Sequence, residues 1–198
     1  MASTLGSSLP CSCRILTTRA LTVTIKLRFS LGFSVAWLTS VHCRSCEIAR
    51  GTRNVEGGII QLGTCWMANH YQDSRDRFLG WLVLQPKKHR VDSSEMTSRE
   101  LREFGGVSQR LETALKRACD SMFFGDRVEI VYVVRLAEST VERRPQWHLH
   151  WHMIPRTRSM GRMGALGWNI GKARRMAKKR NPTAYEIQAL MDRIRASL

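Results

Sequence analysis

Three histidines occupy alternate positions in the segment Trp147-His-Leu-His-Trp-His-Met-Ile-Pro155. Side chains of a β-strand alternate between its two faces, so His148, His150 and His152 are expected to line one face. The other face takes the apolar residues Trp147, Leu149, Trp151 and Met153. Three adjacent imidazoles buried in a core would each need separate hydrogen-bonding partners, which disfavours a purely structural role. This spacing therefore predicts a strand with one face packed in the core and the other face available for chemistry.

A row of imidazoles can bind a metal ion or act on a phosphate group. A His-x-His pair on a strand can hold one ion. At about 3.3 Å per residue, however, His148 and His152 lie about 13 Å apart, too far to share that ion without other strands. The same row suits a phosphate chain, with His150 opposite the phosphorus and a donor on each side. We favour phosphate chemistry and keep a metal centre as the alternative.

Hydrophobic patterning predicts the elements that position this segment. Thr97-x-x-Glu100 is a capping box that starts a helix running to about Cys119. Asn181-Pro182 is expected to cap a terminal helix whose apolar stripe is Ile187, Leu190, Met191 and Ile194. Strands are expected at residues 59–62, 65–68, 80–85, 127–134 and 147–154. The pattern predicts an α+β domain with a mostly antiparallel sheet of about five strands, one long helix and a C-terminal amphipathic helix.

Two motifs resemble the histidine triad (HIT) family. His148-Leu-His-Trp-His-Met-Ile154 meets the family signature His-φ-His-φ-His-φ-φ, where φ is apolar. Gly80-Trp-Leu-Val-Leu-Gln-Pro-Lys-Lys-His89 is similar to the family's strand that ends in a Pro-Lys-x-His turn. The expected helix and the following strand come in the family's order, so the resemblance covers roughly residues 43–156. It implies a HIT domain over residues 41–156.

The resemblance also implies an activity, namely hydrolysis or transfer of nucleotidyl groups from a nucleotide or nucleotide conjugate. His150 would attack the α-phosphate and form a nucleotidyl-histidine intermediate. His152 would bind phosphate or the leaving oxygen, and His148 would orient its neighbour. His152 stands where uridylyltransferases have Gln, which favours the hydrolase-like branches. Gln146 is a further expected substrate contact, and residues 69–73 leave open which residue binds the ribose.

A zinc site is implied by the same resemblance. Cys43-x-x-Cys46 lies before the first expected strand of the domain, and the family's matching positions add His89 and His148. Zinc held by these four residues would be structural, because a closed set of four ligands leaves no position for water. The alternative is a pair of free thiols. No organic cofactor is expected, and the resemblance implies a homodimer.

The net charge of +16 lies mainly at the chain ends. Residues 47–155 carry 16 basic and 14 acidic side chains, whereas residues 156–198 carry 11 basic and 2 acidic ones. We therefore expect a basic C-terminal tail with the terminal helix over residues 157–198. The tail is either a solvated segment or a nucleic-acid contact. The alternative functions are thus a HIT protein that removes adenylate from nucleic-acid ends, or a non-catalytic purine nucleotide-binding protein.

Residues 1–40 form a poorly patterned N-terminal extension, rich in Ser, Thr and Leu and without Asp or Glu. We interpret it as sequence upstream of the true start, as a targeting segment or as a flexible extension, and exclude it from the fold. The six cysteines show no disulfide framework, which favours a cytoplasmic location. The longest apolar stretch is about ten residues, short of the roughly 20 that span a bilayer, so no membrane contact is expected.

Overall fold

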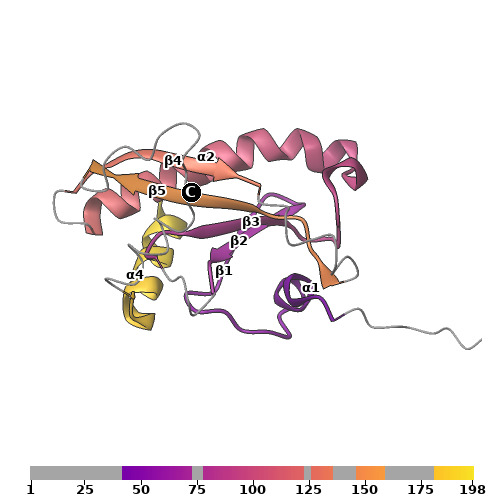
Figure 1. Ribbon diagram of the computed structural model, residues 1–198, viewed down its shortest axis with the longest axis horizontal. Helices are drawn as coiled ribbons and strands as arrows, with labels where there is room; N and C mark the ends of the chain where they lie inside the picture. Colours follow the sequence, from indigo (N-terminus) through magenta and orange to yellow (C-terminus); the bar gives the residue numbers. More distant parts are fainter. Residues whose placement is uncertain (1–41, 73–77, 123–125, 136–145, 159–180) are drawn as a thin grey trace, which may run out of the picture. The chain divides into compact units, whose positions relative to one another are not determined.

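The computed structural model describes residues 42–72, 78–122, 126–135, 146–158 and 181–198 (Figure 1). The extension over residues 1–40 and most of the basic tail lie outside these residues. In chain order the described elements are α1 (Arg44–Ala49), β1 (Ile59–Leu62), β2 (Trp66–His70), β3 (Leu82–Pro86), the 3₁₀ turn η1 (Ser93–Glu95), α2 (Ser98–Met122), β4 (Val128–Val134), β5 (Trp151–Thr157) and α4 (Ala184–Ala196). None of the described helices is long and apolar enough to cross a membrane.

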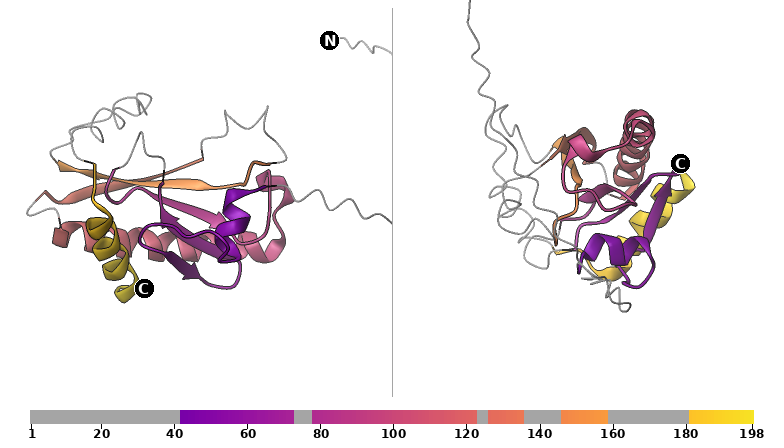
Figure 2. Two further views of the ribbon diagram at one scale, coloured as in Figure 1. Left: turned by 90° about the horizontal axis from the view of Figure 1, so that it is seen from below. Right: turned by 90° about the vertical axis from the view of Figure 1, so that its right-hand side faces the viewer.

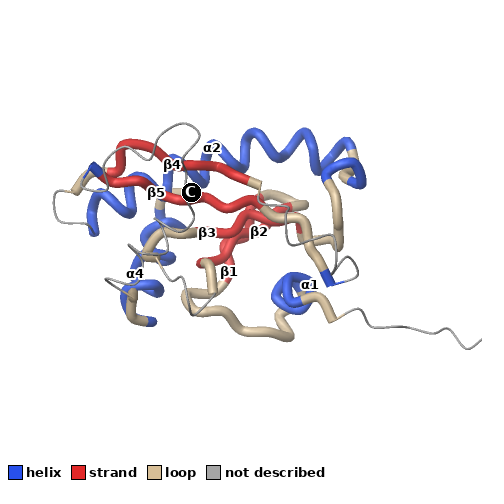
Figure 3. Tube along the Cα trace, viewed as in Figure 1, coloured by secondary structure: helices blue, strands red, loops and turns tan. Residues whose placement is uncertain are grey.

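The five strands form one antiparallel sheet in the order β1-β2-β3-β5-β4 (Figure 3). The histidine strand β5 therefore lies between β3 and β4 rather than at an edge. Its register pairs Val83 with His152, and β2 in turn pairs Asn69 with Val83. Directly paired residues share a face of a sheet, so these three side chains lie on one face. The α+β architecture expected from the sequence is confirmed.

The opposite face of the sheet packs on helix α2 (Figure 2). Leu111 and Leu115 of the helix belong to one buried cluster with Trp66, Leu84 and Met153 of the strands. The helix begins with the predicted capping box. The Thr97 N–H donates to Glu100 Oε2 at 2.7 Å, and the Glu100 N–H donates back to Thr97 Oγ1 at 3.3 Å. This arrangement satisfies two donors that a helix start otherwise leaves unpaired.

The terminal helix α4 belongs to the same hydrophobic core. Its predicted stripe is buried, with Ile187, Leu190, Met191 and Ile194 each at 0 % exposure. The predicted cap is wrong, because Thr183 is the N-cap and forms a capping box with Glu186. Asn181 therefore lies before the cap, and the helix starts two residues later than Pro182.

The strand expected over residues 147–154 starts only at Trp151. Before Trp151, the chain makes other hydrogen bonds in place of those between neighbouring strands. The Leu149 N–H donates to the Arg90 carbonyl at 2.7 Å, and the His148 carbonyl accepts from the His150 ring at 2.7 Å. The alternation of faces persists, because Leu149 and Met153 are fully buried in the core. Trp147 departs from it and lies 4.8 Å from the His150 ring, centroid to centroid.

Candidate active site

His150 is held as a neutral imidazole with a defined tautomer. Its Nδ1 lies 2.7 Å from the His148 carbonyl oxygen, which can only accept, so Nδ1 carries the proton. The lone pair of the neutral ring is then on Nε2. Burial lowers the pKa of His150, the hydrogen bond to His148 opposes that shift, and the charge of Arg135 adds to it. At neutral pH the ring therefore offers an unprotonated Nε2.

His152 has the opposite tautomer. The indole Nε1–H of Trp81 donates to His152 Nδ1 at 2.9 Å, so the His152 proton is on Nε2. Burial, followed by the charge of the neighbouring His150, lowers the pKa of His152 to about 3. The two histidine rings meet edge to face with centroids 4.8 Å apart. His152 is therefore a neutral hydrogen-bond donor beside the lone pair of His150.

His148 points toward the two cysteines. Its Nε2 lies 2.8 Å from the Pro86 carbonyl and must be the donor, so Nδ1 carries the lone pair. That Nδ1 is 3.4 Å from Cys43 Sγ and 3.6 Å from Cys46 Sγ. Burial lowers the pKa of His148 to about 4, and the neighbouring His89 and His150 contribute in the same direction. A neutral ring with its lone pair aimed at two thiols is prepared to bind a metal ion.

The four predicted metal ligands come together. Cys46 Sγ lies 3.4 Å from His89 Nδ1, and the four ligand atoms of Cys43, Cys46, His89 and His148 all lie within 4.8 Å of one another. Tetrahedral zinc with Zn–S near 2.3 Å and Zn–N near 2.0 Å separates sulfur from nitrogen by about 3.5 Å. The sulfur–nitrogen separations of 3.4 to 3.6 Å in this cluster match that value. The donor set therefore has the chemistry and the spacing of a tetrahedral metal site.

Helix α1, which sequence reasoning missed, supplies one side of this cluster. Cys43 is its N-cap, and the Cys43 Sγ accepts from the Cys46 N–H at 3.5 Å. The C-x-x-C spacing thus places both thiols at the first turn. Burial, with the adjacent Cys43 thiol, raises the pKa of Cys46 to about 11. The six residues of α1 were too few to give a helical period from the sequence alone.

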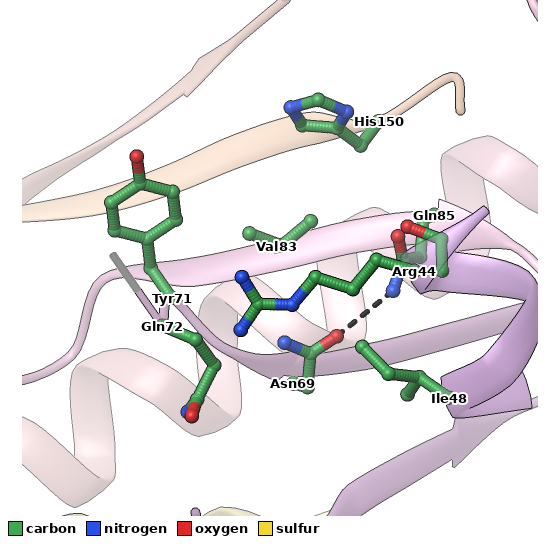
Figure 4. Close-up of a pocket in the computed structure, with 9 residues that line it drawn as sticks. Arg44, Ile48, Asn69, Tyr71, Gln72, Val83, Gln85 and His150 are labelled. Carbon is green, nitrogen blue, oxygen red and sulfur yellow. Dashed lines mark hydrogen bonds between the residues drawn. The ribbon is translucent and has the colours of Figure 1, made fainter. Parts of the chain in front are cut away.

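A pocket of about 420 Å³ opens beside His150 (Figure 4). It lies between α1 and the sheet, and its lining residues are Arg44, Ser45, Ile48, Asn69, Tyr71, Gln72, Val83, Gln85 and His150. Gln85 Nε2 donates to Asn69 Oδ1 at 2.9 Å, the dashed contact of Figure 4. Both of these amides are buried. The pocket therefore combines two apolar side chains with fixed hydrogen-bonding groups, as sites for small ligands commonly do.

Some site residues differ from those expected. Gln146 is exposed and is not among the residues that line the pocket. Of the stretch left open for ribose binding, Asn69, Tyr71 and Gln72 line the pocket, and Asp73 lies outside the described residues. Trp81 was expected only as part of a buried strand, and its indole bond to His152 has no signal in the sequence.

No protein-family model matches the chain, and its sequence matches no curated protein. Solved structures do match. A HIT-like protein involved in cell-cycle regulation from Bartonella henselae is 17 % identical, with a TM-score of 0.50 over 77 % of this chain and 93 % of that one. A hypothetical histidine triad nucleotide-binding protein from Sulfolobus tokodaii is 18 % identical, with a TM-score of 0.51 over 78 % and 91 % of the two chains. This protein therefore has the fold of the histidine triad proteins.

Proposed function

We propose that the protein is a HIT-type nucleotide hydrolase or nucleotidyl transferase in which His150 is the nucleophile. The hydrogen bond from His150 Nδ1 to the His148 carbonyl carries this proposal. It leaves the Nε2 lone pair free on a side chain that lines the pocket. An imidazole that is neutral and oriented can attack phosphorus without a separate general base.

In the first step, the Nε2 lone pair of His150 forms a bond to the α-phosphorus as the bond from phosphorus to the leaving oxygen breaks. The departing oxygen keeps that electron pair and takes a proton from water. His152 keeps its own proton and donates a hydrogen bond through Nε2 to the developing negative charge. The modified His150 is cationic, and the His148 carbonyl stabilises it through Nδ1–H. Water or another acceptor then attacks phosphorus, loses a proton and releases His150.

The pocket beside His150 is proposed to hold the nucleoside. Ile48 and Val83 provide apolar surface for a base, and Asn69 and Gln85 provide hydrogen bonds. With the α-phosphorus at His150, the sugar and base extend into this space. A volume of about 420 Å³ is within the usual range of small-molecule sites, about 300 to 1,000 Å³.

We further propose a structural zinc ion bound by Cys43, Cys46, His89 and His148. The Pro86 carbonyl that accepts from His148 Nε2 is the kind of outer contact that orients a metal-bound histidine. When bound, zinc would connect α1 to the turn after β3 and hold the His148 side chain in place. The His148 carbonyl in turn orients His150, so the same residue connects the metal site to the nucleophile.

The function is tested by trapping the intermediate. Rapid acid-free quenching of the full chain with an α-labelled substrate should give an acid-labile, base-stable phosphoramidate that maps to His150. His150→Asn should lower turnover by several orders of magnitude and keep the fold, as loss of a nucleophile does. His42→Asn, at an exposed histidine, is the matched control and should keep wild-type activity.

If His150→Asn retains more than about a tenth of wild-type activity, direct attack by this residue is wrong. A panel of adenosine phosphoramidate, dinucleoside polyphosphates and adenylated DNA would then assign the substrate branch for an active protein. Nucleotide binding without any turnover would instead favour the non-catalytic alternative. The expected homodimer is checked by light scattering on the same preparation.

A further inference from the structure

Among the described residues that line it, the pocket beside His150 has a cationic side chain and no carboxylate. Arg44 is the first residue of α1, and Figure 4 shows its side chain extending from that helix toward the Tyr71 and Gln72 side of the pocket. Within the described part of the chain, no hydrogen bond or ion pair of the Arg44 guanidinium is found, and the other eight lining residues include no Asp or Glu. Arg90 and Arg135, by contrast, are each paired with a carboxylate.

The polar groups around Arg44 are neutral and held in place. Asn69 and Gln85 are 4 % and 2 % exposed. Asn69 accepts from Gln85 at 2.9 Å and donates to the His70 carbonyl at 2.8 Å. These amides carry no charge, so they leave the positive charge of the guanidinium uncompensated. Among the described residues that line the pocket, the exposed Arg44 is therefore the one with a permanent charge.

Ribose hydroxyls and ribose phosphates require different partners. In dinucleotide-binding folds, a carboxylate accepts a hydrogen bond from the ribose 2′-hydroxyl, whereas an arginine accommodates a phosphate at that position. A guanidinium offers paired donors that match the geometry of a phosphate. The described residues that line the pocket include an arginine and no carboxylate.

We propose that this pocket selects nucleotides that carry a second phosphate on the ribose, at the 2′ or the 3′ position, and that Arg44 binds this phosphate. The inference rests on the proposed function in one respect, because the α-phosphorus at His150 places the sugar in the pocket. Arg44 thereby determines specificity and takes no part in the step at phosphorus.

Binding is measured by titration calorimetry with the full chain at one fixed ionic strength, because charge attraction depends on salt. The ligands are adenosine 2′,5′-bisphosphate, adenosine 3′,5′-bisphosphate and adenosine 5′-diphosphate. The diphosphate carries its second phosphate at the 5′ end, so it controls for general attraction to a basic protein. At least one bisphosphate should bind about tenfold or more tightly than the diphosphate, the scale of a charge-assisted hydrogen bond. The two bisphosphates distinguish the 2′ from the 3′ position.

Arg44→Gln should remove this preference and bring the bisphosphates to within about twofold of the diphosphate, since the charge-assisted contact is lost. Arg110→Gln, at an exposed position on α2, changes the net charge equally and should keep the preference. Thermal melting of both variants confirms folding. Arg44→Lys keeps the charge without the paired donors, so it should retain only part of the preference.

The inference is overturned if the wild type binds the diphosphate as tightly as both bisphosphates. It is also overturned if Arg44→Gln weakens all three ligands equally, because Arg44 would then contact a group they share. Either result leaves the proposed function intact when the His150 intermediate is trapped. Failure to trap that intermediate, with the Arg44-dependent preference present, would overturn the proposed function and not this pocket specificity.

Discussion

The indole Nε1–H of Trp81 donates a hydrogen bond of 2.9 Å to Nδ1 of His152. Both side chains are buried, at 2 % and 5 % exposure. An indole nitrogen can only donate, so His152 must accept at Nδ1 and hold its own proton on Nε2. Trp81 also stacks on Tyr71 with ring centroids 4.5 Å apart, which fixes the indole plane. Trp81 thus positions His152 as a donor next to His150.

Replacing Trp81 by Phe should release His152 from this tautomer. The phenyl ring can still stack on Tyr71, but His152 Nδ1 loses its donor. Proton-nitrogen correlation spectra of the wild type should show His152 protonated on Nε2, and those of Trp81→Phe should show a mixture of tautomers. Loss of an oriented donor should lower turnover by about tenfold or more. A buried unpaired acceptor should also cost about 1 to 3 kcal/mol of unfolding free energy.

Trp66→Phe is the matched control for that experiment. Trp66 is equally buried, and its indole donates to the Glu100 carbonyl at 3.0 Å on the core side of the sheet. This substitution should lower stability and leave the His152 signals unchanged. Identical His152 spectra in Trp81→Phe and the wild type would contradict the positioning role of Trp81.

Most of the fold could be predicted because periodicity and end signals agree in the long elements. The helix that starts after Thr97 and the stripe of α4 are dictated by apolar spacing, and both are confirmed. The start of β5 could not be predicted. The residues from Trp147 onward alternate like a strand, but the Leu149 N–H there donates to the Arg90 carbonyl instead of to a neighbouring strand. Such long-range partners have no local signal.

The candidate site could be predicted where its residues lie close together in the sequence. Three histidines within five positions are readily recognised, and the resemblance adds Cys43 and Cys46 from a distant segment. Arg44 and Trp81 carry no such signal. Arg44 is a cation on a short helix, and Trp81 is a buried aromatic residue just before β3. Their roles depend on the sheet order that places β5 between β3 and β4.

Protein purified without chelator should contain about one zinc ion per chain, because a closed Cys₂His₂ set binds zinc strongly. Substituting both Cys43 and Cys46 by Ser should remove the metal and lower the melting temperature. Cys65→Ser is the control, since Cys65 lies outside the cluster of potential metal ligands and should keep the zinc content. Elemental analysis measures each sample. A zinc content near zero in the unmodified protein would contradict the proposed site.

Acid should destabilise the protein partly through Glu100. Burial raises the pKa of this carboxyl, but hydrogen bonds from Thr97 and from Arg90 outweigh burial and lower it. A folded pKa below the unfolded value gives stability that is present above the unfolded pKa, near 4.5, and is lost as pH falls through the folded pKa. Glu100→Gln should therefore lower the unfolding free energy at pH 7 by about 1 to 3 kcal/mol and flatten its fall below about pH 5.

The comparison for Glu100 is Glu112→Gln, which removes a surface i,i+4 pair with Lys116. Exposed pairs of this kind contribute about 0.3 to 0.5 kcal/mol, so this variant should stay close to wild type at pH 7. Denaturant unfolding at pH 7, 5, 4 and 3 measures both variants. Equal pH dependence in Glu100→Gln and the wild type would show that Glu100 does not contribute to acid unfolding.

Two glycines should respond to alanine with opposite signs. Gly80 precedes Trp81 with φ of +91°, and a Cβ there would lie 2.8 Å from Pro155 Cγ and 3.0 Å from Cys119 Sγ. Gly80→Ala combines a left-handed backbone with overpacking from two elements, so it should lower the unfolding free energy by about 2 kcal/mol or more. Gly105 lies in α2, and a Cβ added to it would meet nothing within 4 Å. Gly105→Ala should raise the unfolding free energy by about 0.5 to 1 kcal/mol, because alanine is the better helix former.

Because Gly80 adjoins Trp81, its substitution should also lower turnover, whereas Gly105→Ala should leave turnover unchanged. Denaturant unfolding and steady-state rates of both variants measure these effects. A stable, fully active Gly80→Ala protein would contradict the tight packing that holds Trp81 against His152.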